Sequence, residues 1–156
     1  MTDAEIAAEL AELVRLDVDA VLAYDRAIGA IGEGSVSRTL ASFKLDHQRH
    51  VLELSGALLA MGVEPPEAQP DLKGTILGGV TAVRARLGTG QALQAMRTNE
   101  QLTTSSYARA LAKPFPDHVL EIVRRGDADE RRHLAWIERA LDERLWERDD
   151  ASPAAP

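Results

Sequence analysis

The chain has 156 residues, the length of one ordinary domain with enough side chains to bury a core. Hydrophobic residues make up 45% and charged residues 28%, a globular composition that excludes an intrinsically disordered chain. The net charge of −7 disfavours nucleic acid as a partner, and no apolar run approaches the roughly 18 residues that a membrane span needs.

The sequence contains no cysteine, which excludes disulfides, thiolate zinc sites and cysteine-ligated iron centres. Any metal site must therefore use His, Asp and Glu. The first residues are acidic and lack the basic-then-apolar pattern of a secretion signal, so we expect a cytoplasmic protein.

The first two predicted helices each have one apolar face. The first runs from about Asp3 to Ile31, with a capping box of Thr2 and Glu5 at its start. The second starts near Ser35 or Ser37 and ends at Gly62. The first face comprises Ile6, Leu10, Leu13, Asp17, Tyr24, Ile28 and Ile31. The second comprises Leu40, Phe43, His47, His50, Leu54, Leu58 and Met61. Spacings of three and four residues indicate amphipathic helices.

The pattern breaks over residues 63–89, where three prolines and the glycines at 74, 78 and 79 disfavour a continuous helix. We expect at most a short helix over 72–86. The third helix runs over about 91–112, and a turn with two prolines leads into a fourth that reaches about Glu147. The third face comprises Leu93, Met96, Glu100, Thr103, Tyr107 and Ala110, and the fourth Val119, Val123, Glu130, His133, Ile137 and Leu141.

The connection lengths predict the topology. The first and last connections are short, so each joins antiparallel neighbours, whereas the middle one can span the whole bundle and start the third helix parallel to the second. One long crossover is the ferritin-like arrangement of a four-helix bundle. We expect one all-α domain over residues 1–148 and a polar, disordered tail over 149–156.

Six ionisable residues occupy positions on these apolar faces where leucines are expected. They are Asp17, His47, His50, Glu100, Glu130 and His133. Burying an unpaired charge costs several kcal/mol, and a divalent cation removes much of that cost. Carboxylates combined with imidazoles suit iron, manganese or zinc.

The two halves of the chain repeat the same polar unit. Five pairs of chemically related residues are each separated by 83 positions: Asp17 and Glu100, Tyr24 and Tyr107, Asp46 and Asp129, His47 and Glu130, His50 and His133. Such a repeat predicts a pseudo-twofold bundle with two sets of ligands facing each other at its middle.

These residues resemble those of the ferritin-like superfamily, particularly di-iron proteins of the rubrerythrin and bacterioferritin type. The resemblance rests on Glu130-Arg131-Arg132-His133, a Glu-x-x-His motif, with Asp46 to His50 at the same place in the first half. It covers about residues 3–147, and the stretch Met61 to Pro66 is similar to a small bacterial branch of the superfamily. It implies Glu100 and Asp17 as ligands from the third and first helices.

Two residues depart from the family's pattern. Asp17 replaces a longer Glu, and His47 stands where the family has a bridging Glu. One imidazole ring cannot bridge two ions at the short separation that a carboxylate allows. The site is therefore an asymmetric dinuclear site, a single-metal site, or a metal-free network of hydrogen bonds.

Four further residues are predicted to lie around the ligands and contact them. Asp46 and Asp129 are placed to accept a hydrogen bond from a ligating His on the facing helix, and the alternative is that they are solvated. Tyr24 and Tyr107 orient ligands, donate electrons, or simply fill the core.

The favoured function is a metal-binding ferritin-like protein with two iron ions, or manganese or zinc in their place. The resemblance implies an iron-dependent oxidase or peroxidase that uses dioxygen or peroxide, in a homodimer. An iron-storage cage is disfavoured because only a Pro/Ala tail is expected after the fourth helix. The alternative is a structural or stress-linked interaction module without metal; a zinc hydrolase is less favoured, because no separate general base is evident.

Overall fold

The computed structural model describes residues 1–67 and 88–150, so the predicted short helix over 72–86 lies outside the described residues. Four long helices make up the bundle: α1 (Asp3–Ala30), α2 (Ser35–Ala60), α4 (Thr89–Leu111) and α5 (Asp117–Asp142). A short helix, α6 (Trp146–Asp150), follows them. None of the described helices is long and apolar enough to cross a membrane.

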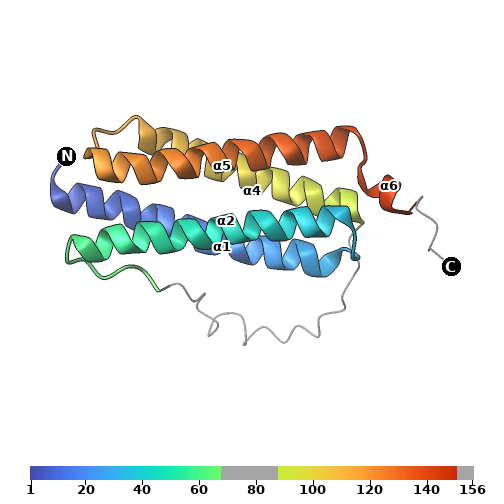
Figure 1. Ribbon diagram of the computed structural model, residues 1–156, viewed down its shortest axis with the longest axis horizontal. Coiled ribbons are helices and arrows are strands. Elements are labelled where there is room, and N and C mark those ends of the chain that lie inside the picture. Colours follow the sequence, from blue (N-terminus) through green and yellow to red (C-terminus); the bar gives the residue numbers. More distant parts are fainter. Residues whose placement is uncertain (68–87, 151–156) are drawn as a thin grey trace.

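The topology is the predicted one. Helices α1 and α2 form one antiparallel pair and α4 and α5 another (Figure 1). The chain leaves α2 at one end of the bundle and enters α4 at the opposite end, so these two helices run parallel. The four-helix bundle with one long crossover is confirmed.

The helix starts and ends follow local chemistry. The predicted capping box is present at α1, where the Thr2 hydroxyl accepts from the Glu5 backbone N–H (3.3 Å) and the Glu5 carboxylate accepts from that of Thr2 (2.7 Å). After α2, Gly62 adopts a left-handed φ of 74°, which ends the helix.

The fourth helix ends earlier than predicted, at Asp142 instead of about Glu147. Arg144 takes a left-handed φ of 50°, and the Leu145 N–H donates to the Ala140 carbonyl at 3.1 Å. This is the hydrogen bond of a Schellman ending, here without glycine. Helix α6 then begins at Trp146, so a short helix does follow the fourth, and the argument against a storage cage from its absence is wrong. Residues 151–156 of the predicted tail lie outside the described residues.

The core consists of two apolar clusters, one toward each end of the bundle. One is built around Leu10, Leu54 and Val123, and the other around Leu40, Leu93 and Ile137. The 83-residue offset also relates buried apolar residues, namely Leu10 and Leu93, Val36 and Val119, Leu40 and Val123, Leu54 and Ile137. The repeat is thus a property of the whole bundle, and its polar positions fall between the two clusters.

Candidate metal centre

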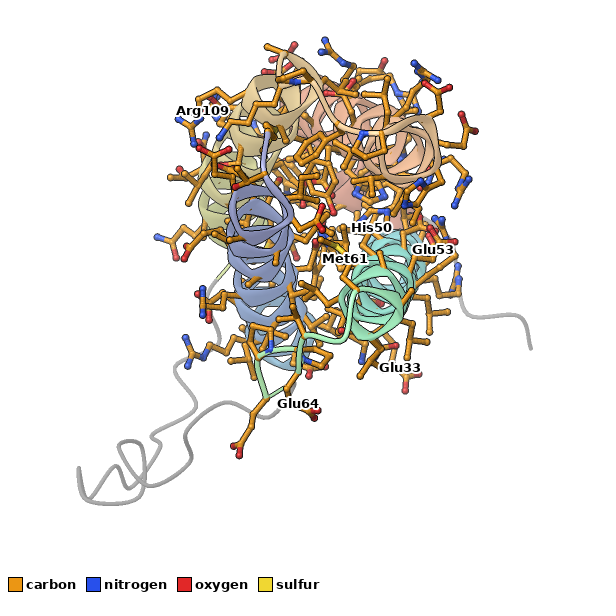
Figure 2. All side chains as sticks on the ribbon, turned by 90° about the vertical axis from the view of Figure 1, so that its left-hand side faces the viewer. Glu33, His50, Glu53, Met61, Glu64 and Arg109 are labelled. Atoms are coloured by element: carbon orange, nitrogen blue, oxygen red, sulfur yellow. The ribbon has the colours of Figure 1, made fainter. Side chains whose placement is uncertain are left out.

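All six predicted ligands lie in one layer at the middle of the bundle. Each is 0% exposed except His50, at 2%. Viewed along the bundle, His50 lies among the helices, whereas Glu33 and Arg109 lie on the outside (Figure 2). One helix turn separates His47 from His50 on α2, so both imidazoles enter the same layer. Glu130 and His133 on α5 have the same spacing.

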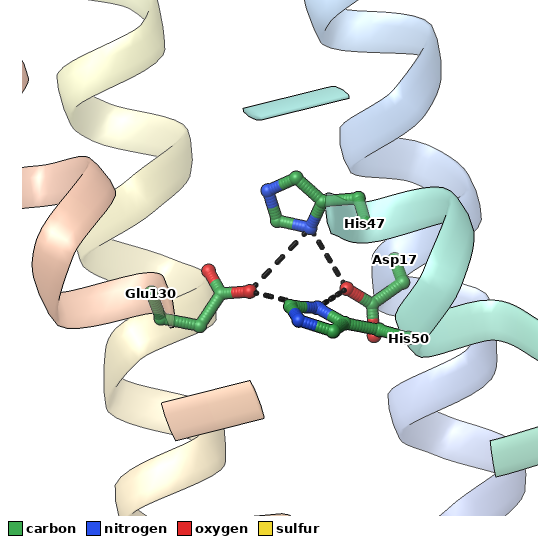
Figure 3. Close-up of side chains that lie close together, drawn as sticks. All are labelled: Asp17, His47, His50 and Glu130. Carbon is green, nitrogen blue, oxygen red and sulfur yellow. Dashed lines mark hydrogen bonds and ion pairs between the residues drawn. The ribbon is translucent and has the colours of Figure 1, made fainter. Parts of the chain in front are cut away.

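A first group of ligands consists of Asp17, His47, His50 and Glu130 (Figure 3). Asp17 Oδ1 lies 2.8 Å from His47 Nδ1 and 3.2 Å from His50 Nδ1. Glu130 Oε1 approaches the same two nitrogens, at 3.5 Å from that of His47 and 3.3 Å from that of His50. One ligand atom from each residue lies within 4.8 Å of the others.

A second group consists of His47, Glu100, Glu130 and His133. One ligand atom from each of these residues again lies within 4.8 Å of the others. His47 Nε2 lies 3.3 Å from Glu100 Oε1, and His133 Nδ1 lies 3.6 Å from Glu100 Oε2. His47 and Glu130 belong to both groups. These are the two residues that the repeat relates to each other, so they lie between the two halves of the centre.

The two tyrosines each fix a carboxylate of the opposite half of the repeat. The Tyr24 hydroxyl donates to Glu100 Oε1 at 2.6 Å, and the Tyr107 hydroxyl donates to Asp17 Oδ2 at 2.6 Å. Close packing of Tyr107 depends on Gly126, because a Cβ there would lie 2.3 Å from a Tyr107 ring carbon. Sequence analysis missed this role of Gly126, since the contact joins different helices.

The outer nitrogens of two histidines meet aspartates on the facing helix. His50 Nε2 lies 3.2 Å from Asp129 Oδ2, and His133 Nε2 lies 3.0 Å from Asp46 Oδ2. These are the positions expected for Asp46 and Asp129. Hydrogen bonds there keep a proton on each Nε2 and turn each Nδ1 to the centre.

Two arginines that sequence analysis did not include hold these aspartates in place. Arg49 donates to Asp129 at 2.5 Å and to Asp46 at 3.1 Å. Arg132 donates to both aspartates at 2.6 Å. Burial raises the pKa of Asp129, but its bonds to Arg49 and His50 outweigh this and hold it at about 2. Arg49 and Arg132 are also 83 residues apart, so the repeat could have revealed them.

Burial and mutual charge shift the pKa values of the central residues. Burial lowers the pKa of His50, but Asp17 and Glu130 outweigh it and raise that pKa to about 9. Burial raises the pKa of Glu130, and the nearby imidazoles of His50 and His47 offset only part of this. Without an ion, the carboxylates and imidazoles therefore act as one another's countercharge.

Four polar atoms of the centre are buried without a hydrogen-bonding partner among the described residues. They are both carboxylate oxygens of Glu130, Oε2 of Glu100 and Nδ1 of His133. An unsatisfied buried carboxylate costs free energy that a bound cation would recover. All four atoms belong to residues of the second ligand group, and the first group shares only Glu130 with it among these three residues. The oxygen and nitrogen donors present, without sulfur, fit iron, manganese or zinc.

Residues 5–113 match the family described as a domain of unknown function, DUF2383. The chain belongs to this family. The DUF2383 match spans nearly all of α1 and the whole of α2 and α4, with Asp17, His47, His50 and Glu100, and it ends before α5. None of the curated proteins matches the chain in sequence.

Among solved structures, Dps from Thermosynechococcus elongatus is similar to this chain, with a TM-score of 0.63. The similarity covers 85% of this chain and 89% of that one, at 15% sequence identity. At this identity the likeness concerns the fold alone, and it shows that this DUF2383 protein has a ferritin-like fold. The narrower resemblance to rubrerythrin and bacterioferritin rests on the motif residues.

Proposed function

We propose that this protein binds iron in the middle of the bundle and serves as an iron-dependent oxidase or peroxidase. The observation that supports the proposal is the set of unsatisfied, fully buried ligand atoms on Glu100, Glu130 and His133. Bound ferrous iron would supply electrons to dioxygen or to peroxide, and two electrons with two protons reduce peroxide to water.

The chain's own residues would hold and insulate the ion. Asp17, Glu100 and Glu130 provide oxygen ligands and negative charge, and His47, His50 and His133 provide nitrogen ligands. Tyr24 and Tyr107 restrict the carboxylates by hydrogen bonds, and Asp46 and Asp129 restrict the imidazoles in the same way. Full burial excludes bulk water, which strengthens each electrostatic interaction. Manganese and zinc are the other metals that this donor set accommodates.

Metal analysis of the purified protein tests the proposal. The protein is produced with iron, manganese and zinc supplied, alongside a His50→Ala, His133→Ala double variant. We expect one to two iron ions per chain in the wild type and loss of iron in the variant. Peroxide and dioxygen should then oxidise the ferrous protein faster than free ferrous iron. The absence of metal from both proteins, at equal stability, would contradict the proposal.

A metal-free interaction module is the second candidate, and one observation favours it. Asp17 already accepts hydrogen bonds from Tyr107 and His47, so that half of the centre is stable without an ion. The absence of bound metal, with no change in stability on adding it, would support this alternative. A zinc hydrolase would instead need a general base beside the ion, and the described residues of the centre are all occupied as ligands or as their partners.

We also propose that the protein is a homodimer and lies in the cytoplasm. Three leucines on one face of α2 support the dimer, because Leu45, Leu52 and Leu59 recur every seven residues and are 57–73% exposed. Light scattering of the wild type and of Leu52→Lys would test it. A monomeric wild type would contradict the dimer.

A further inference from the structure

We infer that the two ligand groups bind metal unequally: His47, Glu100, Glu130 and His133 take the first ion, and the group containing Asp17 and His50 takes a second ion only weakly. The inference rests on the proposed function and goes beyond it, because it assigns an order and an affinity difference to two groups that the internal repeat relates. It follows from the hydrogen bonds that each group makes before an ion arrives.

The orientation of His47 is the first step. A neutral imidazole has one protonated nitrogen and one nitrogen with a free lone pair. His47 Nδ1 makes the shortest contact of the ring, 2.8 Å from Asp17 Oδ1, so the proton belongs there. When His47 binds an ion it keeps this proton, so Nε2, which lies 3.3 Å from Glu100 Oε1, is the nitrogen that binds. It can bind an ion in the second group without giving up the bond to Asp17.

The other three residues of the second group also offer free atoms. Glu100 is held through Oε1 by the Tyr24 hydroxyl, which leaves Oε2 without a partner among the described residues. His133 contacts Asp46 through Nε2, which leaves Nδ1 free. Both oxygens of Glu130 lack hydrogen bonds. An ion bound here displaces only the 3.3 Å contact of His47 Nε2 with Glu100 Oε1, and it satisfies atoms of Glu100, Glu130 and His133 that have no partner.

Apart from Glu130, which both groups share, the first group is already satisfied. Asp17 Oδ2 accepts from Tyr107 at 2.6 Å, and Oδ1 accepts from His47. The remaining imidazole, His50, directs Nδ1 at the same Oδ1 from 3.2 Å. An ion in this group must displace the His47 proton from Asp17 and compete for Glu130. Losing one such charge-assisted hydrogen bond weakens binding by about 10- to 100-fold.

The two groups differ in affinity because of one position of the repeat, where a carboxylate in one half corresponds to an imidazole in the other. Glu130 presents two unsatisfied oxygens at the centre, whereas His47, its counterpart, presents one lone pair. Two carboxylates at these positions would serve both groups alike. Replacing His47 by Glu should therefore make the two groups similar.

Titration of the metal-free full chain with Co²⁺ tests the inference by calorimetry and by Co²⁺ absorption. The wild type should bind one ion tightly and a second at least tenfold more weakly. His133→Ala and His50→Ala are matched variants, because the repeat relates the two positions. We expect His133→Ala to weaken the first binding step by at least tenfold, and His50→Ala to change it by less than about threefold.

Equal first-step losses in the two variants, or two equal steps in the wild type, would overturn the inference. Circular dichroism verifies that each variant is folded, and the wild-type binding curve tests the difference in affinity even if a variant is not. His47→Glu should bring the two affinities within about threefold of each other. A wild type that binds no Co²⁺ would instead contradict the proposed function itself.

Discussion

At the scale of single residues, the chemistry of the centre depends on contacts that join the two halves of the repeat. Tyr24 holds Glu100 and Tyr107 holds Asp17, so each tyrosine acts on the other half's carboxylate. The sequence identified both tyrosines and both carboxylates from their 83-residue offset. It could not say which tyrosine serves which carboxylate, because that depends on how the helix pairs face each other in space.

Gly126 provides a test of this packing. Gly→Ala inside a helix usually stabilises a protein by about 1 kcal/mol. At Gly126 the new Cβ would lie 2.3 Å from the Tyr107 ring, so we expect Gly126→Ala to lower the free energy of unfolding by about 1–3 kcal/mol. Urea denaturation measures the change.

Gly56 is the matched control for this substitution. It also lies inside a helix, α2, but a Cβ there meets nothing within 4 Å. Gly56→Ala should raise stability by about 0.5–1 kcal/mol. A stabilising Gly126→Ala would mean that Tyr107 does not pack on α5 as described.

At the scale of helices, hydrophobic periodicity predicted the four long helices and which face of each is buried. Leu10, Phe43 and Met96 are buried as expected, whereas residues near the helix ends, such as Ile28 and Leu141, are only half-buried. The early end of α5 was missed because its left-handed residue is Arg144 and not a glycine. Local sequence signals find a helix end only where the residue type reveals the backbone conformation.

The left-handed backbone at Arg144 predicts that glycine at this position would stabilise the protein. A non-glycine residue at φ 50° has a backbone cost of about 1 kcal/mol that glycine avoids. The ion pair of Arg144 with Glu147 is exposed and contributes little. We expect Arg144→Gly to raise the free energy of unfolding by about 0.5–1 kcal/mol. A higher midpoint of thermal unfolding would show this. Arg144→Ala removes the same ion pair but keeps the Cβ, so an equal gain there would refute the backbone explanation.

At the scale of the whole molecule, a polar layer divides the core into two apolar clusters. The side chains of the layer come from all four long helices, so the layer connects the two antiparallel pairs at their middle. The repeat allowed this layer to be predicted from the sequence, since related polar residues at one offset must meet if the two halves fold alike. The unequal satisfaction of the two ligand groups could not be predicted, because it depends on individual hydrogen bonds.

This division of the core makes metal removal a test of the whole bundle. An ion that contacts residues of α2, α4 and α5 binds the native state and not the unfolded chain, so it should stabilise the fold by mass action. At a free-ion concentration 100-fold above the dissociation constant, the gain is about 2.7 kcal/mol. We therefore expect chelation to lower the unfolding midpoint by several degrees. The His133→Ala variant, which lacks one ligand of the second group, should show a much smaller shift. Equal midpoints with and without chelator in the wild type would mean that the carboxylates and imidazoles balance one another, and that the bundle is stable without metal.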